Sequence, residues 1–164
     1  MKINYAIADL HKIIRCIYKI SGCAISIWDT ELKQIAYEPS YHSRFCTLIK
    51  TKKEGYGRCL GSDIAILSEA REKRALCVHR CHAGLIDAAM PVLRDGNILG
   101  YIMFGQLQEP TEDKPSFDMV WEHMKDLGFD RDEMEEAFGR IRYIDREGVD
   151  AIGEILNFCI STLK

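Results

Sequence analysis

The chain has 164 residues, a length that fits one domain and can bury a hydrophobic core without disulfides or metal ions. Apolar residues make up 47% and charged residues 29%, which is typical of a soluble protein and excludes a disordered or fibrous chain. The net charge of −3 offers no basic surplus for phosphates, no apolar run approaches the ~20 residues that span a bilayer, and the N-terminus does not resemble a signal peptide. We therefore expect one cytoplasmic domain, residues 1–164, that contacts neither nucleic acid nor membrane.

The N-terminal part of the chain predicts a helix followed by a β-hairpin. Apolar side chains recur every three or four residues over Asn4–Ile20, which is the spacing of one face of an amphipathic helix. Two short β-branched or aromatic runs, Ala24–Trp28 and Gln34–Tyr37, flank a polar turn. This pattern is typical of a hairpin.

A helical insert follows the hairpin. We expect a short helix over Phe45–Lys50, a break at Gly55 and Gly57, and a longer helix from about Arg58 to Lys73. The residues expected to face inward on the longer helix are Ile64, Leu67 and Ser68.

Three consecutive β-like stretches come next: Arg74–Arg80, Leu85–Leu93 and Ile98–Gln108. The last two are separated by Asp95–Asn97, in which Asp, Gly and Asn follow one another. Gly and Asn tolerate the positive φ angles of tight turns, so this segment predicts a second hairpin.

The remainder of the chain is predicted to be helical over three segments: Phe117–Leu127, Arg131–Arg140 and Arg146–Leu163. Asp130 and Asp145 stand where N-caps are expected. The order is helix, two strands, helices, three strands, helices. We therefore predict an α+β fold, a PAS-like five-stranded antiparallel sheet with inserted helices and with flanking helices at both termini.

Seven cysteines are many for a cytoplasmic chain, and an odd number cannot all pair within one molecule. Cys16, Cys23 and Cys159 have the surroundings of small buried hydrophobes. The denser group, which we consider as candidate metal ligands, comprises Cys46, Cys59, Cys77 and Cys81.

The spacing of this second group matches no zinc-finger pattern. In a straight strand Cys77 and Cys81 lie about 13 Å apart, too far for one tetrahedral site. The fourth ligand beside Cys46, Cys59 and Cys81 is therefore left open among Cys77, His79 and His82. Zinc or an iron–sulfur cluster are the candidate cofactors, and a metal- or redox-sensing module is the alternative function.

A small-molecule pocket is predicted between the sheet and the helical insert, because apolar walls with a few polar groups are typical of such sites. A polar amide in an otherwise apolar strand needs a partner, so Gln106 is the candidate polar anchor. The residues assigned to ligand binding are Trp28, His82, Met90, Met103 and Gln106.

Catalytic motifs are scarce in the sequence, which lacks a nucleophile elbow, a phosphate-binding glycine loop and a His-Glu-x-x-His helix. Cys81 and His82 are a nucleophile and base in principle, but no third member orients them. The sequence thus favours a binding domain over an enzyme.

Several strings taken together resemble the PocR-type sensory domain. They are Phe45-Cys46-x-Leu-Ile, Gly57-x-Cys59-x-x-Ser-Asp63, Arg80-Cys81-His82-Ala83-Gly84-Leu85-x-Asp87, Pro91-Val92, Gly100-Tyr-Ile and Gly105-Gln106. The match in order and spacing runs from about Ser21 to Gln108. Cys46, Cys59 and Cys81 match family cysteines, whereas Cys77 has no firm counterpart.

The resemblance implies a PAS-like fold and the sensing of small diols or other hydrocarbon derivatives. Such domains are attached to AraC-type DNA-binding domains or to bacterial signalling kinases, so an output domain or partner outside this sequence is expected. The terminal helices each carry an apolar stripe, which predicts a homodimer built from both.

Overall fold

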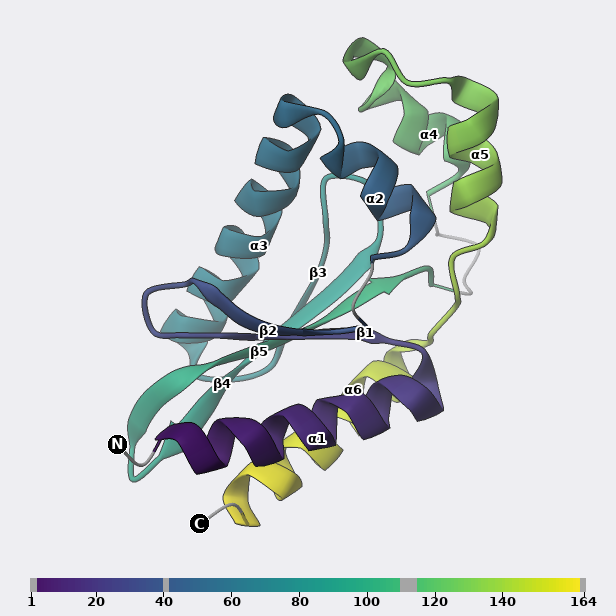
Figure 1. Ribbon diagram of the computed structural model, residues 1–164. Coiled ribbons are helices and arrows are strands. Elements are labelled where there is room, and N and C mark those ends of the chain that lie inside the picture. The colour runs from purple at the N-terminus through teal and green to yellow at the C-terminus, as the bar shows by residue number, and fades with distance from the viewer. Residues whose placement is uncertain (1–2, 40–41, 110–114, 163–164) are drawn as a thin grey trace.

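A computed structural model describes residues 3–39, 42–109 and 115–162, with side chains from residue 8 onward (Figure 1). The helices are α1 (Ile3–Ser21), α2 (Arg44–Lys50), α3 (Lys53–Lys73), α4 (Phe117–Glu122), a 3-10 turn at Lys125–Leu127, α5 (Arg131–Gly139) and α6 (Arg146–Thr162). The strands are β1 (Ala24–Trp28), β2 (Gln34–Glu38), β3 (Cys77–Arg80), β4 (Ile86–Arg94) and β5 (Asn97–Leu107). In this part of the chain no helix is both long and apolar enough to cross a membrane.

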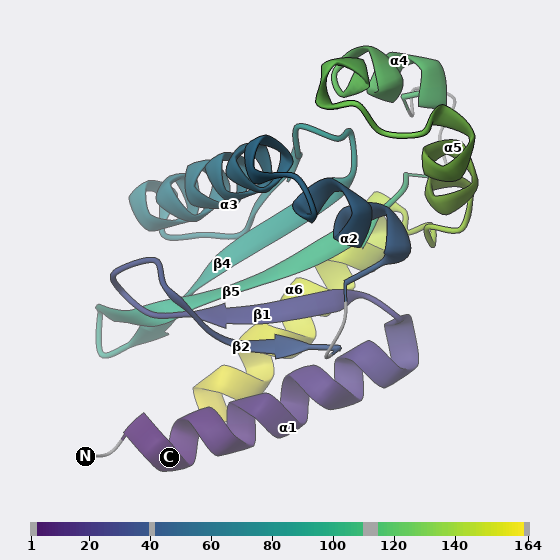
Figure 2. The ribbon, with the colours of Figure 1, turned by 45° about the horizontal axis from the view of Figure 1, so that its top comes forward.

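The strands form one antiparallel sheet in the order β2-β1-β5-β4-β3. Figure 2 shows α1 and α6 against one face of this sheet and α3, with α2 at its end, over the other. The five-stranded antiparallel sheet, the helices inserted after its second strand and the helices at both ends confirm the predicted α+β, PAS-like fold.

Side chains alternate between the two faces along each central strand, as the pleat requires. Ile102 and Phe104 of β5 pack with α1 and α6, whereas Tyr101 packs with Ile66 and Leu67 of α3. Both faces of the central strands are therefore buried. This explains the nearly continuous apolar runs of β4 and β5 in the sequence.

A third apolar cluster joins α2 to α4 and α5, away from the centre of the sheet. The rings of Phe45 and Phe138 meet edge to face with centroids 5.3 Å apart, and Arg44 forms an ion pair with Glu133 at 2.7 Å. These contacts hold α2 at the end of α3, over the same face of the sheet. The placement of α2 matters because this helix borders the cavity described below.

The hairpin and capping predictions are confirmed. Asp95 and Gly96 both have positive φ, 49° and 77°, the backbone of a tight turn between β4 and β5. Asp130 accepts from the backbone of Glu133 at 2.8 Å, and Asp145 accepts from that of Gly148 at 2.7 Å. Both aspartates therefore cap helices, as their positions predicted.

Two element boundaries and one prediction of an inward-facing residue are wrong in the α3–β3 region. α3 runs unbroken through Gly55 and Gly57, and the chain turns earlier, between α2 and α3. Ile64 is 40% exposed, and the buried α3 face holds Ile66 and Leu67 instead. The third strand begins at Cys77 and not at residue 74, because Arg74 ends α3 in the left-handed conformation.

Helix α4 is shorter than predicted, because it ends at Glu122 and is followed by the separate 3-10 turn. Gly128 closes this turn with φ 68°, a conformation that glycine adopts without steric cost.

Gly55 permits the close approach of α2 and α3, which a matched pair of glycine variants tests. A Cβ at Gly55 would lie 2.3 Å from the backbone oxygen of Ile49, whereas one at Gly57 meets no described atom within 4 Å. We expect Gly55→Ala to lower the unfolding free energy by about 1–3 kcal/mol through overpacking. Gly57→Ala should raise it by about 0.5–1 kcal/mol through helix propensity. Urea denaturation measures both; equal effects of the two substitutions would contradict this packing.

Candidate functional site

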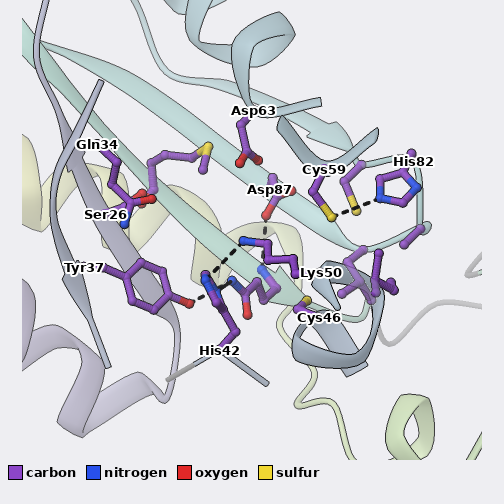
Figure 3. A pocket seen from close by; sticks show the side chains of 16 residues that line it. Ser26, Gln34, Tyr37, His42, Cys46, Lys50, Cys59, Asp63, His82 and Asp87 are labelled. Atoms are coloured by element: carbon purple, nitrogen blue, oxygen red, sulfur yellow. Dashed lines mark hydrogen bonds between the residues drawn. The ribbon is translucent and has the colours of Figure 1, made fainter. Parts of the chain in front are cut away.

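A small cavity of about 50 Å³ lies between the sheet and the α2–α3 insert (Figure 3). Its wall mixes polar groups, thiols and apolar side chains. The lining residues are Ser26, Gln34, Tyr37, His42, Cys46, Ile49, Lys50, Cys59, Asp63, Cys81, His82, Ala83, Leu85, Asp87, Met103 and Gln106. We call this space the inner cavity.

A larger cavity of about 490 Å³, the outer cavity, borders the inner one. Both are lined by Gln34, His42, Lys50, Cys59 and Asp63. Trp28, Tyr56 and Leu60 add an apolar wall to the outer cavity only. The shared residues therefore mark the passage between the two spaces.

A β-bulge at Gln106 sets the shape of the inner cavity. Ile86 pairs with Leu107 and Asp87 pairs with Gly105, so Gln106 is an extra residue without a partner on β4. Regular alternation would turn its side chain toward α1 and α6, as in Ile102 and Phe104. The bulge, with φ 60° at Gln106, brings the side chain to the inner cavity instead. A non-glycine residue at positive φ is strained, and such residues cluster at functional sites.

Asp87 holds the bulge in place, because its Oδ1 accepts from the backbone N–H of Gln106 at 3.2 Å. The carboxyl group lies directly over Gly105, where an added Cβ would come within 2.1 Å of Oδ1. The Gly105-Gln106 pair thus has a steric reason: only a residue without a side chain lets the carboxyl group approach the bulge.

The Gln106 amide joins three segments of the chain. Its Oε1 accepts from the backbone N–H of Ser43 at 3.3 Å, and its Nε2 donates to Tyr37 Oη at 2.8 Å and contacts His42 Nδ1 at 3.0 Å. Ser43 is the N-cap of α2 and Tyr37 lies on β2. The oxygen and one amide hydrogen are therefore bonded within the protein and the second hydrogen faces His42 Nδ1, so Gln106 positions α2 and His42 over the cavity.

Two carboxyl groups face the inner cavity with little compensation. Burial, and next the charge of the neighbouring Asp63, raise the pKa of Asp87 to about 7. Burial likewise raises the pKa of Asp63 to about 6. Lys50 acts against both shifts, but its ammonium has no carboxylate oxygen within 4.0 Å among the described residues.

His42 is a neutral imidazole between two hydrogen-bond donors. Burial, and next the charge of Lys50, lower its pKa to about 4. Lys50 Nζ lies 3.2 Å from His42 Nε2 while the Gln106 amide lies on the Nδ1 side. A neutral ring accepts at one nitrogen only, so one of the two donors lacks an acceptor. An oxygen atom in the cavity would supply it.

The structure brings Cys46, Cys59 and Cys81 to the inner cavity, but Cys77 lies elsewhere. Cys77 packs in the core beneath α3, where its Sγ contacts the backbone oxygen of Ala75 at 3.7 Å. His79, another candidate fourth ligand, does not line the inner cavity. Across the residues that the structure describes, no three His, Cys, Asp or Glu side chains are arranged to hold a metal ion. The assignment of these thiols to a zinc or iron–sulfur centre stays a prediction.

The cysteine that pairs with His82 is Cys59, not the adjacent Cys81. Cys59 Sγ lies 3.2 Å from His82 Nε2, and the backbone N–H of His82 donates to Ser62 Oγ at 3.0 Å. Burial raises the pKa of Cys59 to about 11 and lowers that of His82. The pair is thus a neutral thiol and a neutral imidazole, which does not favour a thiolate nucleophile.

The five residues assigned to ligand binding are separated by the fold. Met103, Gln106 and His82 line the inner cavity, whereas Trp28 lines the outer cavity. Met90 lies on the opposite face, in the core formed with α1 and α6. The residue that pairs with Met103 is Ala89, so the side chain of the next residue, Met90, turns away from the site.

Sequence reasoning missed His42, Lys50, Asp63 and Asp87 as lining residues. Asp87 carried a signal, since a single carboxylate inside the apolar run of β4 needs a reason to be there. Asp63 and Lys50 carried none, because charged residues on helices are normally solvated.

The sheet, its inserted helices and the enclosed cavity define a protein of the PAS-like class. The chain belongs to the family described as the sensory domain found in PocR, whose profile matches residues 5–163. The regulatory protein PocR of Salmonella typhimurium (strain LT2) is 28% identical over 99 residues, covering 60% of this chain and 32% of that protein. The matched segment thus spans about a third of that relative.

Two solved structures are similar at 11% identity. A GAF domain/HD domain protein from Geobacter sulfurreducens has a TM-score of 0.46, covering 97% of this chain and 90% of its own. A transcriptional regulator of the IclR family has a TM-score of 0.42, covering 94% of this chain and 95% of its own.

The raised pKa of Asp87 makes stability pH-dependent. The folded protein holds this proton more tightly than the unfolded chain, so the unfolding free energy falls as pH rises from about 4 through 7. Between pH 6 and 8 the wild type should lose about 1 kcal/mol relative to Asp87→Asn, which has no such proton to lose. Urea denaturation at both pH values measures this. The exposed variant Asp132→Asn should keep the wild-type profile; if Asp87→Asn keeps it too, the carboxyl group is not buried as described.

Proposed function

We propose that the domain senses a small hydroxylated molecule, such as a short diol, that binds in the inner cavity without being converted. The observation that carries this proposal is the cavity wall itself, in which carboxyl groups and an ammonium group lie close together on apolar surroundings. A hydroxyl group both donates and accepts, so it satisfies a carboxylate and Lys50 at once.

The dimensions support a small effector. About 50 Å³ exceeds the space of one water molecule and is far below the several hundred Å³ of drug-sized pockets. A molecule of a few non-hydrogen atoms suits the inner cavity, with the outer cavity as its route of entry. Neither the neutral Cys59–His82 pair nor the remaining wall supplies an activated nucleophile, which favours binding over turnover.

The end of β5 offers a path from the cavity to α6. Two residues beyond Gln106, the buried Gln108 donates to Phe138 O at 2.6 Å. Its backbone N–H donates to Arg142 O at 2.8 Å, and its backbone oxygen accepts from Ile144 N–H at 2.9 Å. These bonds hold the segment that leads into α6. An effector that displaces the bulge would therefore shift the start of the C-terminal helix.

The outer face of the α1–α6 layer suits a second copy of the chain. Ile155 and Phe158 of α6 are 53% and 71% exposed. The neighbouring helix α1 presents the exposed Arg15 and Lys19, whereas α6 presents exposed acidic residues. Opposite charges beside an apolar patch favour a twofold dimer, through which the shift of α6 reaches an output domain.

Effector binding is testable by thermal shift. We expect 1,2-propanediol to raise the melting temperature of the wild type in a concentration-dependent way. Gln106→Leu should raise the diol concentration needed for the same shift about tenfold, because α2 and His42 lose their hydrogen bonds to the Gln106 amide. Met90→Leu, a volume-conserving change on the opposite face, serves as the control and should respond like the wild type. If Gln106→Leu responds like the wild type, the cavity is not the binding site.

Dimerisation is testable by light scattering at micromolar concentrations. The wild type should have the mass of two chains, and Phe158→Glu should have that of one, because the charge cannot be buried in the interface. Met119→Glu, at a position of similar exposure on α4, is the matched control and should stay dimeric. A monomeric wild type at every concentration would contradict this interface.

A further inference from the structure

We propose that the effector of the inner cavity carries a protonated amine beside its hydroxyl group, so that its class is the small amino alcohols. The inference rests on the proposed function, because it names the ligand of that same cavity. Its basis is the balance of charge and of hydrogen-bond donors around Asp63 and Asp87.

The two carboxyl groups have more acceptor atoms than the described residues satisfy. Together they present four oxygens. Among the described residues, one hydrogen bond reaches them, from Gln106 N–H to Asp87 Oδ1. Asp87 is 7% exposed and Asp63 is partly buried, so both carboxyl groups lie where few water molecules reach them. Figure 3 shows both carboxyl groups directed into the space between the sheet and the insert.

The charges of the wall do not cancel. Among the described residues that line the inner cavity, Lys50 is the one lysine or arginine. His42 is neutral, and the thiols of Cys46 and Cys59 are protonated because burial raises their pKa values. Two carboxylates and one ammonium leave a net charge of −1 when both acids are ionised.

A monovalent cation of hydrogen-bonding shape fits this deficit. An alkylammonium group supplies three donors and one positive charge to the carboxyl pair, whereas a hydroxyl group supplies one donor and no charge. A hydroxyl group on the adjacent carbon accepts from Lys50, which lacks a carboxylate partner among the described residues. An anionic ligand of the same size would face Asp63 and Asp87 and be repelled.

The affinity for such a cation must depend on pH. Asp63, Asp87, Lys50, His42 and Tyr37 are titratable groups of the wall, together with His82 and the three thiols. Burial lowers the pKa values of His42 and His82 and so favours their neutral forms. The two carboxyls have raised pKa values near 6 and 7, so they lose their protons between pH 5.5 and 8. Ionisation of both strengthens cation binding as pH rises, and a neutral diol lacks this charge term.

Three compounds with one carbon skeleton test the inference by calorimetric titration at pH 7.5: 1-amino-2-propanol, 1,2-propanediol and lactate. We expect the amino alcohol to bind at least about tenfold more tightly than the diol, and lactate to bind most weakly. Lowering the pH to 5.5 should weaken the amino alcohol about tenfold and change the diol little.

Two variants assign the effect to the acid pair. Asp63→Asn should weaken the amino alcohol about tenfold and the diol less than threefold, and Asp87→Asn should act in the same direction. Asp63 is partly exposed, so its variant is expected to fold, which the melting temperature verifies. Glu72→Gln, an exposed change on the same helix, is the control.

The outcomes distinguish a failure of the amino-alcohol inference from a failure of the proposed function. Equal or tighter binding of the diol overturns the amino-alcohol inference and leaves the sensing of a small hydroxylated molecule intact. Tighter binding of the amino alcohol that Asp63→Asn and Asp87→Asn do not change also overturns the inference. If none of the three compounds binds, both the inference and the proposed function are wrong.

Discussion

The hydrogen bond from the backbone of Gln106 to the carboxyl group of Asp87 stabilises the local distortion of the sheet on which the contacts of the Gln106 amide depend. It stabilises an extra residue at positive φ in the central strand, at a cost of about 1–3 kcal/mol in backbone strain. The bulge turns Gln106 toward α2, and the Gln106 amide then fixes Tyr37, His42 and Ser43. Without this bond, regular pairing would direct Gln106 into the α1–α6 core and remove its side chain from the wall of the inner cavity.

The same carboxyl group is also an energetic liability. Asp87 is buried in a sheet that is apolar on both faces, and Asp63 approaches it from α3 without a hydrogen bond to any described residue. The bulge accounts for Asp87 but not for a second carboxyl group beside it, since burial of an uncompensated charge destabilises a protein. The arrangement is understandable if an effector completes it. The domain then is least stable when its cavity lacks a ligand, and binding energy is available to shift α2 and the end of β5.

Periodicity and turn chemistry were sufficient to predict the five strands, their antiparallel hairpins and the caps at Asp130 and Asp145, because these are local properties. The pocket was predicted between the sheet and the insert, where the structure has a cavity with Met103 and Gln106 in its wall, and its role in binding stays a prediction. Met90 was assigned wrongly because the face of a strand depends on its register with the neighbouring strand, which one sequence does not reveal. Lys50 and Asp63 were missed because the orientation of a charged helix residue depends on tertiary packing. Cys77 was grouped with the other cysteines by sequence spacing, which does not reveal that β3 places it in the core beneath α3.

The ionisation of Asp87 in the folded protein is the quantity on which this description depends most. Carbon-13 NMR of the side-chain carboxyl groups, recorded across a pH titration, reports it for Asp87 and Asp63 separately. The structure predicts midpoints near 7 for Asp87 and near 6 for Asp63, both displaced to lower pH when a cationic ligand binds. A midpoint near 4 for Asp87 would show that its carboxylate is solvated or paired, and would contradict the buried, uncompensated acid pair.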